Sequence, residues 1–259
     1  MDLGIAGKKA LVWGGSRGMG KAIAFQLAQE GAQVHIAARK AQTLEAAARE
    51  ILAATGAQIK TLAADLSTAS GREAALTLCP DPDILINNAD GPVPGDFRDW
   101  SREDWIAALD AMMLGPIEMI RQTVDGMAER GFGRIVNITS RSVKAPQAEL
   151  GLSNGARSGL VGFVAGLARA FAHRNVTINN LLPGIFDSDG QRRHVSALAA
   201  QTGRSFEEIW QQRVAATPSR RYGRPGEIGA YCAFLCSAQA GYITGQSLLI
   251  DGGSYPGTF

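Results

Sequence analysis

Glycines between an apolar run and a helix-like segment form the first stretch of the chain that predicts chemistry. Gly14, Gly18 and Gly20 follow the apolar residues 10–13, and Met19 begins an apolar-periodic helix. A strand, a glycine turn and a helix N-terminus together bind phosphate, because the helix start offers unpaired N–H groups and the positive end of its dipole. Glycine also serves tight turns for purely steric reasons. The position between a strand and a helix favours a dinucleotide site.

Two arginines near this turn favour a phosphorylated nucleotide. Arg17 lies inside the turn. Arg39 directly follows the next apolar run, 33–38, at the position where an acid would bind a ribose 2′-hydroxyl. Guanidinium groups bind phosphate through charge-assisted, often bidentate hydrogen bonds. The sequence therefore predicts NADP(H) rather than NAD(H), with the alternative that both arginines are ordinary exposed residues.

Alternating strand-like and helix-like segments must position these groups. Strands are expected at 10–13, 33–38, 58–62, 83–87, 133–139, 176–182 and 247–251, and helices at 41–55, 101–129, 151–173 and 227–237. This alternation predicts an α/β fold with a doubly wound parallel sheet of seven strands and helices on both faces. No linker divides residues 1–259, so one Rossmann-type domain is expected, with a substrate cap inserted at about 187–225 that contains helix-like text at 196–201 and 205–215.

Composition excludes several classes of function. The net charge is +2, from 26 basic and 24 acidic residues, which gives no field suited to nucleic acid. Three cysteines and three scattered histidines predict no metal site and no disulfide framework, and the thiols are expected to be buried. No run approaches the ~18 apolar residues of a membrane span, and the N-terminus has no signal-peptide core. A soluble, cytoplasmic protein is expected.

Six motifs in order resemble the short-chain dehydrogenase/reductase family over nearly the whole chain. They are Gly14-x-x-x-Gly18-x-Gly20, Asp65, Asn87-Asn88-Ala89, Ser140, Pro183-Gly184 with Ser188, and Asp251-Gly252-Gly253. The resemblance implies ligand binding beyond the carboxyl ends of the strands. The cofactor contacts it implies are Gly14, Ser16, Arg17, Gly18, Met19, Gly20, Arg39, Asp65, Leu66, Asn88, Ala89, Arg157, Pro183, Gly184 and Ser188.

The catalytic residues depart from the family pattern. Ser153 and Arg157 stand where the family has the tyrosine and lysine of Tyr-x-x-x-Lys, Met112 replaces a helix asparagine, and Asp90 replaces a glycine. In the family the tyrosine moves the substrate proton, and the lysine lowers the tyrosine pKa and holds the ribose. A serine is a far weaker acid than a phenol of pKa ~10, and arginine does not relay protons at neutral pH. Losing a positioned acid costs about 10²–10⁴ in rate.

The expected catalytic set is therefore Ser140, Ser153, Arg157 and Asp90. The two serines are expected to hydrogen-bond a carbonyl or imine together, and Arg157 to hold the nicotinamide ribose. Asp90 is a candidate acid or ribose ligand. Alternatively, Ser153 only makes room for substrate, and Asp90 is a turn residue before Gly91. His194 is either a group that titrates near neutrality or a solvated residue of the cap.

These groups favour reduction of an activated C=O or C=N group or a conjugated C=C bond in a small molecule. The dienoyl-CoA reductases of the family are similar in having serine in place of the tyrosine, although they keep the lysine. Non-redox members form an alternative (a cyclase, a dehydratase, or a lyase like the halohydrin dehalogenases, which have Ser, Tyr and Arg), and a non-catalytic nucleotide sensor forms another. The resemblance also implies a homo-tetramer or homo-dimer through helices 101–129 and 151–173, with outward Leu160, Val164 and Leu167.

The cap is rich in arginine. Its members are Arg192, Arg193, Arg204, Arg213, Arg220 and Arg221. Such a lid favours a carboxylate, phosphate or acyl-carrier substrate, or is simply a solvated charged face. Asp187 and Asp189 are further candidates to face the substrate.

Overall fold

Seven parallel strands form the centre of the computed structural model, which describes residues 1–258. The strand order is β3-β2-β1-β4-β5-β6-β7, so the direction of winding reverses beside β1. The strands are β1 (Lys9–Trp13), β2 (Gln33–Ala38), β3 (Lys60–Ala63), β4 (Ile84–Asn88), β5 (Gly133–Ile138), β6 (Val176–Pro183) and β7 (Ser247–Ile250). The central strands β1, β4, β5 and β6 are almost entirely buried, as strands covered on both faces are, whereas the edge strands β3 and β7 are only partly buried.

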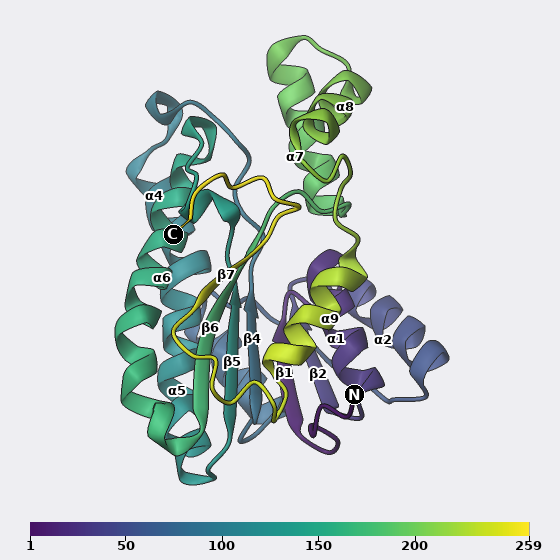
Figure 1. Ribbon diagram of the computed structural model, residues 1–259, viewed down its shortest axis with the longest axis vertical. Helices are drawn as coiled ribbons and strands as arrows, with labels where there is room; N and C mark the ends of the chain where they lie inside the picture. Colours follow the sequence, from purple (N-terminus) through teal and green to yellow (C-terminus); the bar gives the residue numbers. More distant parts are fainter. Residues whose placement is uncertain (259) are drawn as a thin grey trace.

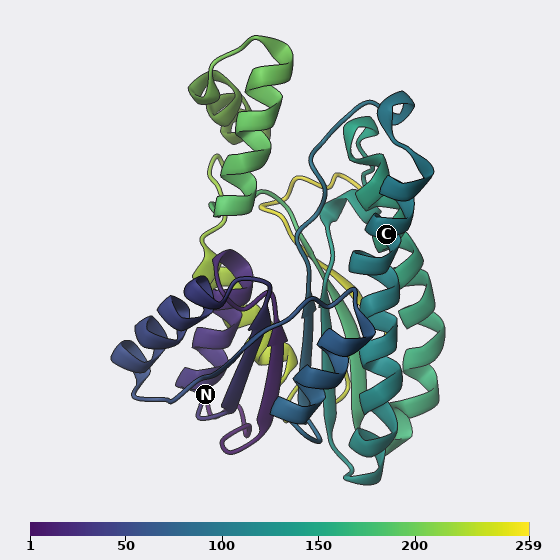
Figure 2. The ribbon, with the colours of Figure 1, turned by 180° about the vertical axis from the view of Figure 1, so that it is seen from behind.

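Helices cover both faces of the sheet, which confirms the predicted doubly wound fold (Figure 1, Figure 2). One apolar cluster joins the sheet to α1 (Gly18–Gln29), α2 (Ala41–Thr55) and α9 (Pro225–Leu235). A second cluster joins the other face to α3 (Ala69–Leu78), α5 (Gly115–Glu129) and α6 (Gly151–Phe171). All three cysteines are free and buried in these clusters, as expected.

The helix expected at 101–129 is interrupted. Ser101 and Asp104 form a reciprocal capping box at the start of α4 (Arg102–Leu109), and a π-helical turn, η2 (Asp110–Leu114), then leads into α5. Pro116 explains the break, because its ring carries no N–H for the continuing ladder. Met112 is buried inside this turn.

Helix α3 is absent from the sequence prediction. Thr68 caps it by accepting a hydrogen bond from the N–H of Gly71. Only Gly71 and Ala75 of the helix are buried, so no apolar stripe marks it in the sequence. The preceding strand, β3, begins at Lys60, two residues later than the expected 58–62. It has few apolar positions, so its start is poorly marked in the sequence.

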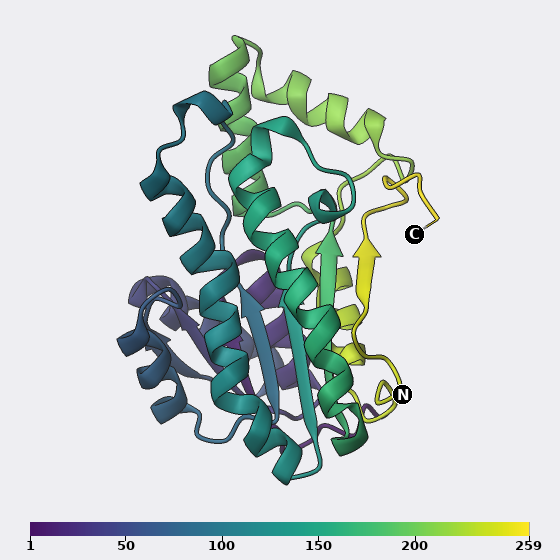
Figure 3. The ribbon, with the colours of Figure 1, turned by 90° about the vertical axis from the view of Figure 1, so that its left-hand side faces the viewer.

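The outward side of α6 differs from the expectation. Leu160 and Val164 lie at 2% and 0% exposure in the apolar cluster against the sheet, and Leu167 packs at its edge. The prediction that these residues face a second subunit is therefore wrong for Leu160 and Val164. Phe163 is 36% exposed and marks the outward face of the helix. Figure 3 shows α6 as the outermost long helix of its layer, beside α5.

A row of asparagine side chains crosses the sheet. Asn137 on β5 accepts from Asn87 on β4 at 2.9 Å and donates to Asn180 on β6 at 3.1 Å. Asn180 in turn donates to Ser247 on β7 at 3.3 Å. These residues are also register partners in the sheet. A slip of one residue would break every one of these bonds, so the row fixes the strand register.

Two helices of the cap project beyond the carboxyl ends of the strands (Figure 1). They are α7 (Asp189–Thr202) and α8 (Phe206–Ala216), so α7 begins earlier than the expected 196–201. Stacked rings hold α8 to the following loop, with Trp210 lying 5.4 Å from Phe206 and 3.8 Å from Tyr222 between ring centroids. Within residues 1–258, no helix is long and apolar enough to cross a membrane.

Candidate active site

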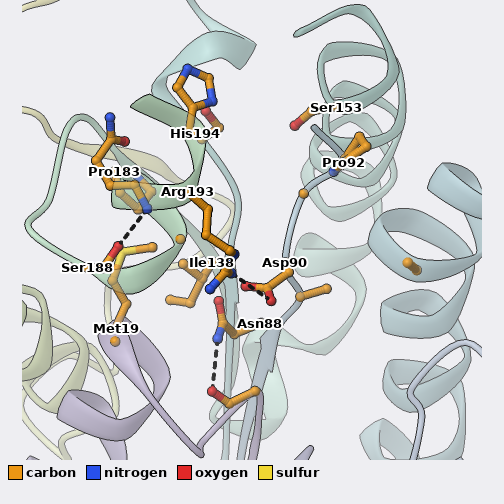
Figure 4. Close-up of a pocket in the computed structure, with 18 of the residues that line it drawn as sticks. Met19, Asn88, Asp90, Pro92, Ile138, Ser153, Pro183, Ser188, Arg193 and His194 are labelled. Carbon is orange, nitrogen blue, oxygen red and sulfur yellow. Dashed lines mark hydrogen bonds and ion pairs between the residues drawn. The ribbon is translucent and has the colours of Figure 1, made fainter. Parts of the chain in front are cut away.

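A cavity of about 650 Å³ opens at the carboxyl ends of the strands (Figure 4). Its volume lies within the range of small-molecule sites. All the residues that the sequence predicts for catalysis line it, namely Ser140, Ser153, Arg157 and Asp90. The predicted cofactor residues that line it are Gly14, Ser16, Arg17, Gly18, Met19, Arg39, Asp65, Leu66, Asn88, Ala89, Arg157, Pro183, Gly184 and Ser188, whereas Gly20 lies behind the turn.

The glycine turn is shaped by sterics and leaves a free helix end. A Cβ at Gly20 would collide with the carbonyl of Gly14, and a Cβ at Gly14 would collide with the Asn88 side chain. Gly18 has φ +53°, which favours glycine. Helix α1 starts without a side-chain cap from Arg17 and without an acid in its first turn. Its uncapped start therefore fits the pyrophosphate of a dinucleotide.

Asp90 gathers three arginines from distant segments. Its Oδ2 lies 2.8 Å from Arg17 Nη2, 3.4 Å from Arg193 Nη2 of α7 and 3.9 Å from Arg39 Nη2 (Figure 4 shows the contact with Arg193). The two arginines expected at a 2′-phosphate thus meet the same carboxylate. Exposed ion pairs contribute only about 0–1 kcal/mol each, so a bound phosphate can compete for these arginines.

Arg157 is buried, and most of its N–H groups donate hydrogen bonds to other groups of the protein. Its Nη1 donates to the carbonyls of Ile138 at 2.7 Å and Thr139 at 3.0 Å, and its Nη2 donates to the carbonyl of Ala89 at 3.0 Å. Its Nε donates to Ser153 Oγ at 3.1 Å. Burial lowers the pKa of Arg157 to about 10, and the charge of Asp90 partly opposes this shift. Arg157 therefore braces α6 against the ends of β4 and β5, with a single N–H left for a ribose.

Two hydroxyl groups keep their protons available. Ser140 Oγ accepts from the N–H of Ser142 at 3.1 Å, and Ser153 Oγ accepts from Arg157. Each hydroxyl can therefore donate to a ligand. The guanidinium beside Ser153 strengthens that donor by polarising it. No tyrosine lines the cavity in the described part of the chain.

Asp65 and Asn88 also line the cavity. Asp65 Oδ1 accepts from both the N–H and the hydroxyl of Ser67, at 2.9 and 2.8 Å. Burial by itself would raise the pKa of Asp65, but these hydrogen bonds lower it below its ordinary value. Asn88 Nδ2 donates to the carbonyl of Gly14 at 3.4 Å and joins β4 to the glycine turn.

His194 is neither a solvated residue nor a group that titrates near neutrality. Its Nε2 lies 2.7 Å from Arg213 Nη2. Because a guanidinium only donates, Nε2 is the acceptor and the ring proton is on Nδ1. Burial, together with the positive charge of Arg213, lowers the pKa of His194 to about 4. The ring is therefore neutral at pH 7.

Trp13 and Arg141 line the cavity although neither is among the site residues predicted from the sequence, and Arg213 is predicted only as one of the cap arginines. Trp13 ends β1, and its Nε1 is buried without a hydrogen-bond partner in the described part of the chain. Arg141 directly follows Ser140 at the end of β5, a position that could have indicated it. Arg213 lies on α8, where only the three-dimensional placement of the cap turns it toward the cavity.

Comparison with known proteins agrees with this architecture. A family model described as enoyl-(acyl carrier protein) reductase matches residues 14–255. The chain is 31% identical to the NADPH-dependent reductase BacG of Bacillus subtilis over 252 residues, which span 95% of this chain and 97% of that one. It is 33% identical to the 3-oxoacyl-[acyl-carrier-protein] reductase FabG of Vibrio cholerae over 259 residues, or 98% and 99% of the two chains.

Solved structures show the same fold. An L-sorbose reductase from Gluconobacter frateurii, complexed with NADPH and L-sorbose, superimposes with a TM-score of 0.91 at 28% identity over 98% of both chains. YwfH, an NADPH-dependent reductase involved in bacilysin biosynthesis, gives a TM-score of 0.90 at 30% identity over 97% of this chain and all of its own. The glycine turn, the sheet order and these relatives together establish that the chain belongs to the short-chain dehydrogenase/reductase family.

Proposed function

We propose that the protein is an NADP(H)-dependent oxidoreductase that reduces an activated C=O, C=N or conjugated C=C bond of a small molecule. Relatives named as NADPH-dependent reductases and the arginines around Asp90 support NADP(H) as the cofactor. The uncapped start of α1 and the glycine turn would hold its pyrophosphate, and Asp65 would meet its adenine. When bound, the cofactor supplies a hydride from C4 of its nicotinamide.

The observation that carries the proposal is a pair of donor hydroxyls in a cavity that no described tyrosine lines. Ser140 and Ser153 hydrogen-bond the oxygen or nitrogen of the substrate and stabilise negative charge there. They do not deliver a proton readily, because an alcohol is a much weaker acid than a phenol. The substrate must therefore tolerate the charge, as an enolate does, or carry a positive charge beforehand, as an iminium does.

Arg157 acts on this site through Ser153. Its Nε–H fixes the position of Ser153 Oγ and leaves the serine hydroxyl directed to a ligand. Its remaining Nη2 N–H is placed to bind the nicotinamide ribose, beside the carbonyl of Ala89 that it already contacts. Asp90 holds Arg17 and Arg193 at the entrance rather than acting as the acid.

A substrate panel tests the proposal by following the loss of nicotinamide absorbance. Cyclic imines and conjugated enones are expected to have kcat/KM values at least about 100-fold above those of unactivated ketones, because no positioned acid assists the ketones. Ser140→Ala and Ser153→Ala should each lower kcat about 10- to 1000-fold on the best substrate. Ser101→Ala, in a capping box outside the cavity, is the matched control.

Three results would contradict this function. Rapid reduction of simple ketones would show that a strong acid operates in the site after all. Calorimetry that detects no affinity for either nicotinamide coenzyme would rule out an oxidoreductase that uses NAD(H) or NADP(H). Product formation without any change in nicotinamide absorbance would instead indicate a non-redox member of the family.

A further inference from the structure

Two arginines of the cavity lack a carboxylate partner. Arg141, at the end of β5, and Arg213, on α8, both line the cavity and are both partly buried. Within residues 1–258, Arg141 has no side-chain hydrogen bond or ion pair, and the Arg213 guanidinium bonds only to His194. Burying a guanidinium without an anion beside it costs free energy, because the charge loses its hydration and gains no ion pair. Such a pair indicates a site that a ligand completes.

Other arginines of the cap are satisfied by the protein. Arg192 forms a bidentate pair with Asp187 at 3.0 Å, and Arg221 pairs with Glu227 at 2.6 Å. Arg193 belongs to the Asp90 cluster described above. Arg141 and Arg213 therefore differ from these arginines in having no carboxylate within ion-pair distance in the described part of the chain.

His194 does not neutralise Arg213. The ring accepts a hydrogen bond from the guanidinium and is itself neutral at pH 7, as its lowered pKa shows. It holds the arginine in place while leaving the charge uncompensated. Figure 4 shows His194 and Ser153 toward one end of the cavity and Met19 and Asn88 toward the other, so this charge lies away from the glycine turn.

The charge around Arg141 and Arg213 indicates which class of anion they bind. The charges of Glu149 and Arg141 both act on Arg213: Glu149 supports the charged form and Arg141 opposes it, while burial has the largest effect and lowers the Arg213 pKa. Glu149 therefore offsets part of the positive charge of Arg213 and Arg141 adds to it. That balance suits a carboxylate monoanion better than a phosphate dianion, and the planar guanidinium matches a carboxylate in a bidentate manner.

We propose that Arg141 and Arg213 bind a carboxylate group of the substrate, whose reducible bond lies at Ser140 and Ser153. This inference rests on the proposed function and names its substrate class as oxo or enone acids. Arg141 and Ser140 line the same cavity, so one small molecule can present its carboxylate to Arg141 and its reducible bond to Ser140. Arg213 binds the same group from the cap and thereby joins α8 to the bound substrate.

A binding experiment tests the subsite without requiring turnover. Calorimetry of the NADP⁺-saturated protein with glutarate should detect binding, and glutaramide, its uncharged diamide, should bind at least about 10-fold more weakly. Arg141→Gln and Arg213→Gln should each weaken glutarate binding about 10-fold or more. Arg204→Gln is the matched control, because this exposed arginine of the cap lies outside the cavity and, among residues 1–258, bonds only to Gln212. Equal binding of glutarate and glutaramide, or tighter binding of inorganic phosphate, would overturn the inference.

A kinetic experiment identifies the carboxylate as part of the substrate. With NADPH, 4-oxopent-2-enoate should have a kcat/KM at least about 10-fold above that of its methyl ester, through a lower KM. Arg213→Gln should remove this preference, whereas Arg204→Gln, outside the cavity, should keep it. Equal rates for acid and ester would overturn the inference even if glutarate binds. Loss of NADPH oxidation with every substrate, while glutarate still binds, would contradict the proposed function instead.

Discussion

At the scale of single residues, the active site is organised by how arginines are partnered. Arg157 donates to main-chain carbonyls and to Ser153, Arg17 is paired with Asp90, and Arg213 bonds only to a neutral histidine. The same side chain thus serves as a brace at Arg157, and we propose that it binds phosphate at Arg17 and a carboxylate at Arg213. The difference comes from the surroundings, since guanidinium chemistry is the same in each.

The role of Arg157 shows what the sequence leaves undetermined. The spacing from Ser140 predicts that Ser153 and Arg157 belong to the site, and both line the cavity. The sequence does not reveal that Arg157 reaches the carbonyls of Ile138 and Thr139, because β5 meets α6 only in the folded chain. The expected contact with the ribose therefore stays a prediction, restricted to the remaining N–H.

Replacing Asp90 tests whether its carboxylate competes with the cofactor phosphate. Asp90→Asn removes the anion that holds Arg17, Arg39 and Arg193, so NADPH should bind about 3- to 10-fold more tightly at low salt. The dependence of the Kd on salt should become steeper. Titration of NADPH fluorescence measures both effects.

The matched control for this change is Asp96→Asn, because Asp96 forms an exposed pair with Arg98 outside the cavity. This variant should bind NADPH like the unaltered protein. Weaker NADPH binding by Asp90→Asn would show that the carboxylate organises the arginines rather than competing for them.

His194 predicts a pH dependence of stability. Its pKa is about 4 in the folded protein and about 6.5 when unfolded, so between these values the unfolded chain binds more protons. The contribution of His194 is therefore complete above pH 6.5 and is lost as the pH falls toward 4. After allowance for partial exposure the loss is about 1–2 kcal/mol. Urea unfolding at pH 4.5 and 7.5 should show this loss reduced in His194→Gln.

Exposed His173 provides the comparison, since His173→Gln should leave the pH dependence unchanged. If His194→Gln retained the full loss of stability below pH 6.5, the buried contact with Arg213 would not be its cause.

At the scale of elements, the sequence predicts strands and helices with many buried apolar residues well, and short or mostly polar elements poorly. The strands that carry the site, β1, β4, β5 and β6, lie close to their expected positions, because each is almost entirely buried and contains Val, Ile or Leu residues. Helix α3 has too little buried surface to be recognised, and the π-helical turn before α5 arises from Pro116 within an otherwise continuous helical pattern. The cap helices follow local capping signals, but their position over the cavity depends on tertiary contacts.

The asparagine row predicts a cost for removing one amide. Asn137→Leu has a similar volume, yet it leaves the Asn87 Nδ2 donor and the Asn180 Oδ1 acceptor buried without partners. The expected loss is about 2–4 kcal/mol in the free energy of unfolding, which urea denaturation measures. Adding Asn87→Leu and Asn180→Leu should restore part of this loss, because no unpaired amide then remains in the centre of the row. A triple variant less stable than the single one would argue against this account.

At the scale of the whole molecule, we propose a homo-dimer or homo-tetramer built through α5 and α6, as the family resemblance implies. The exposed Phe163 lies on the outward face of α6, whereas the apolar residues on its other side are committed to the core. Phe163→Glu should therefore shift the molecular mass toward that of the 27.3 kDa monomer in light scattering, with the fold intact by circular dichroism. Phe97→Glu, at an exposed position on another element, should not. A monomeric unaltered protein would contradict the proposal.

The stacked rings of the cap give the molecule an optical reporter. Trp210 is held between Phe206 of its own helix and Tyr222 of the following loop, and the Arg192 guanidinium lies 5.0 Å from its ring. Indole emission is sensitive to nearby charge and to ring contact. Any movement of α8 that draws Arg213 toward an arriving substrate must also slide Trp210 against Tyr222. The wavelength and lifetime of the Trp210 emission would then report this movement of the cap during turnover.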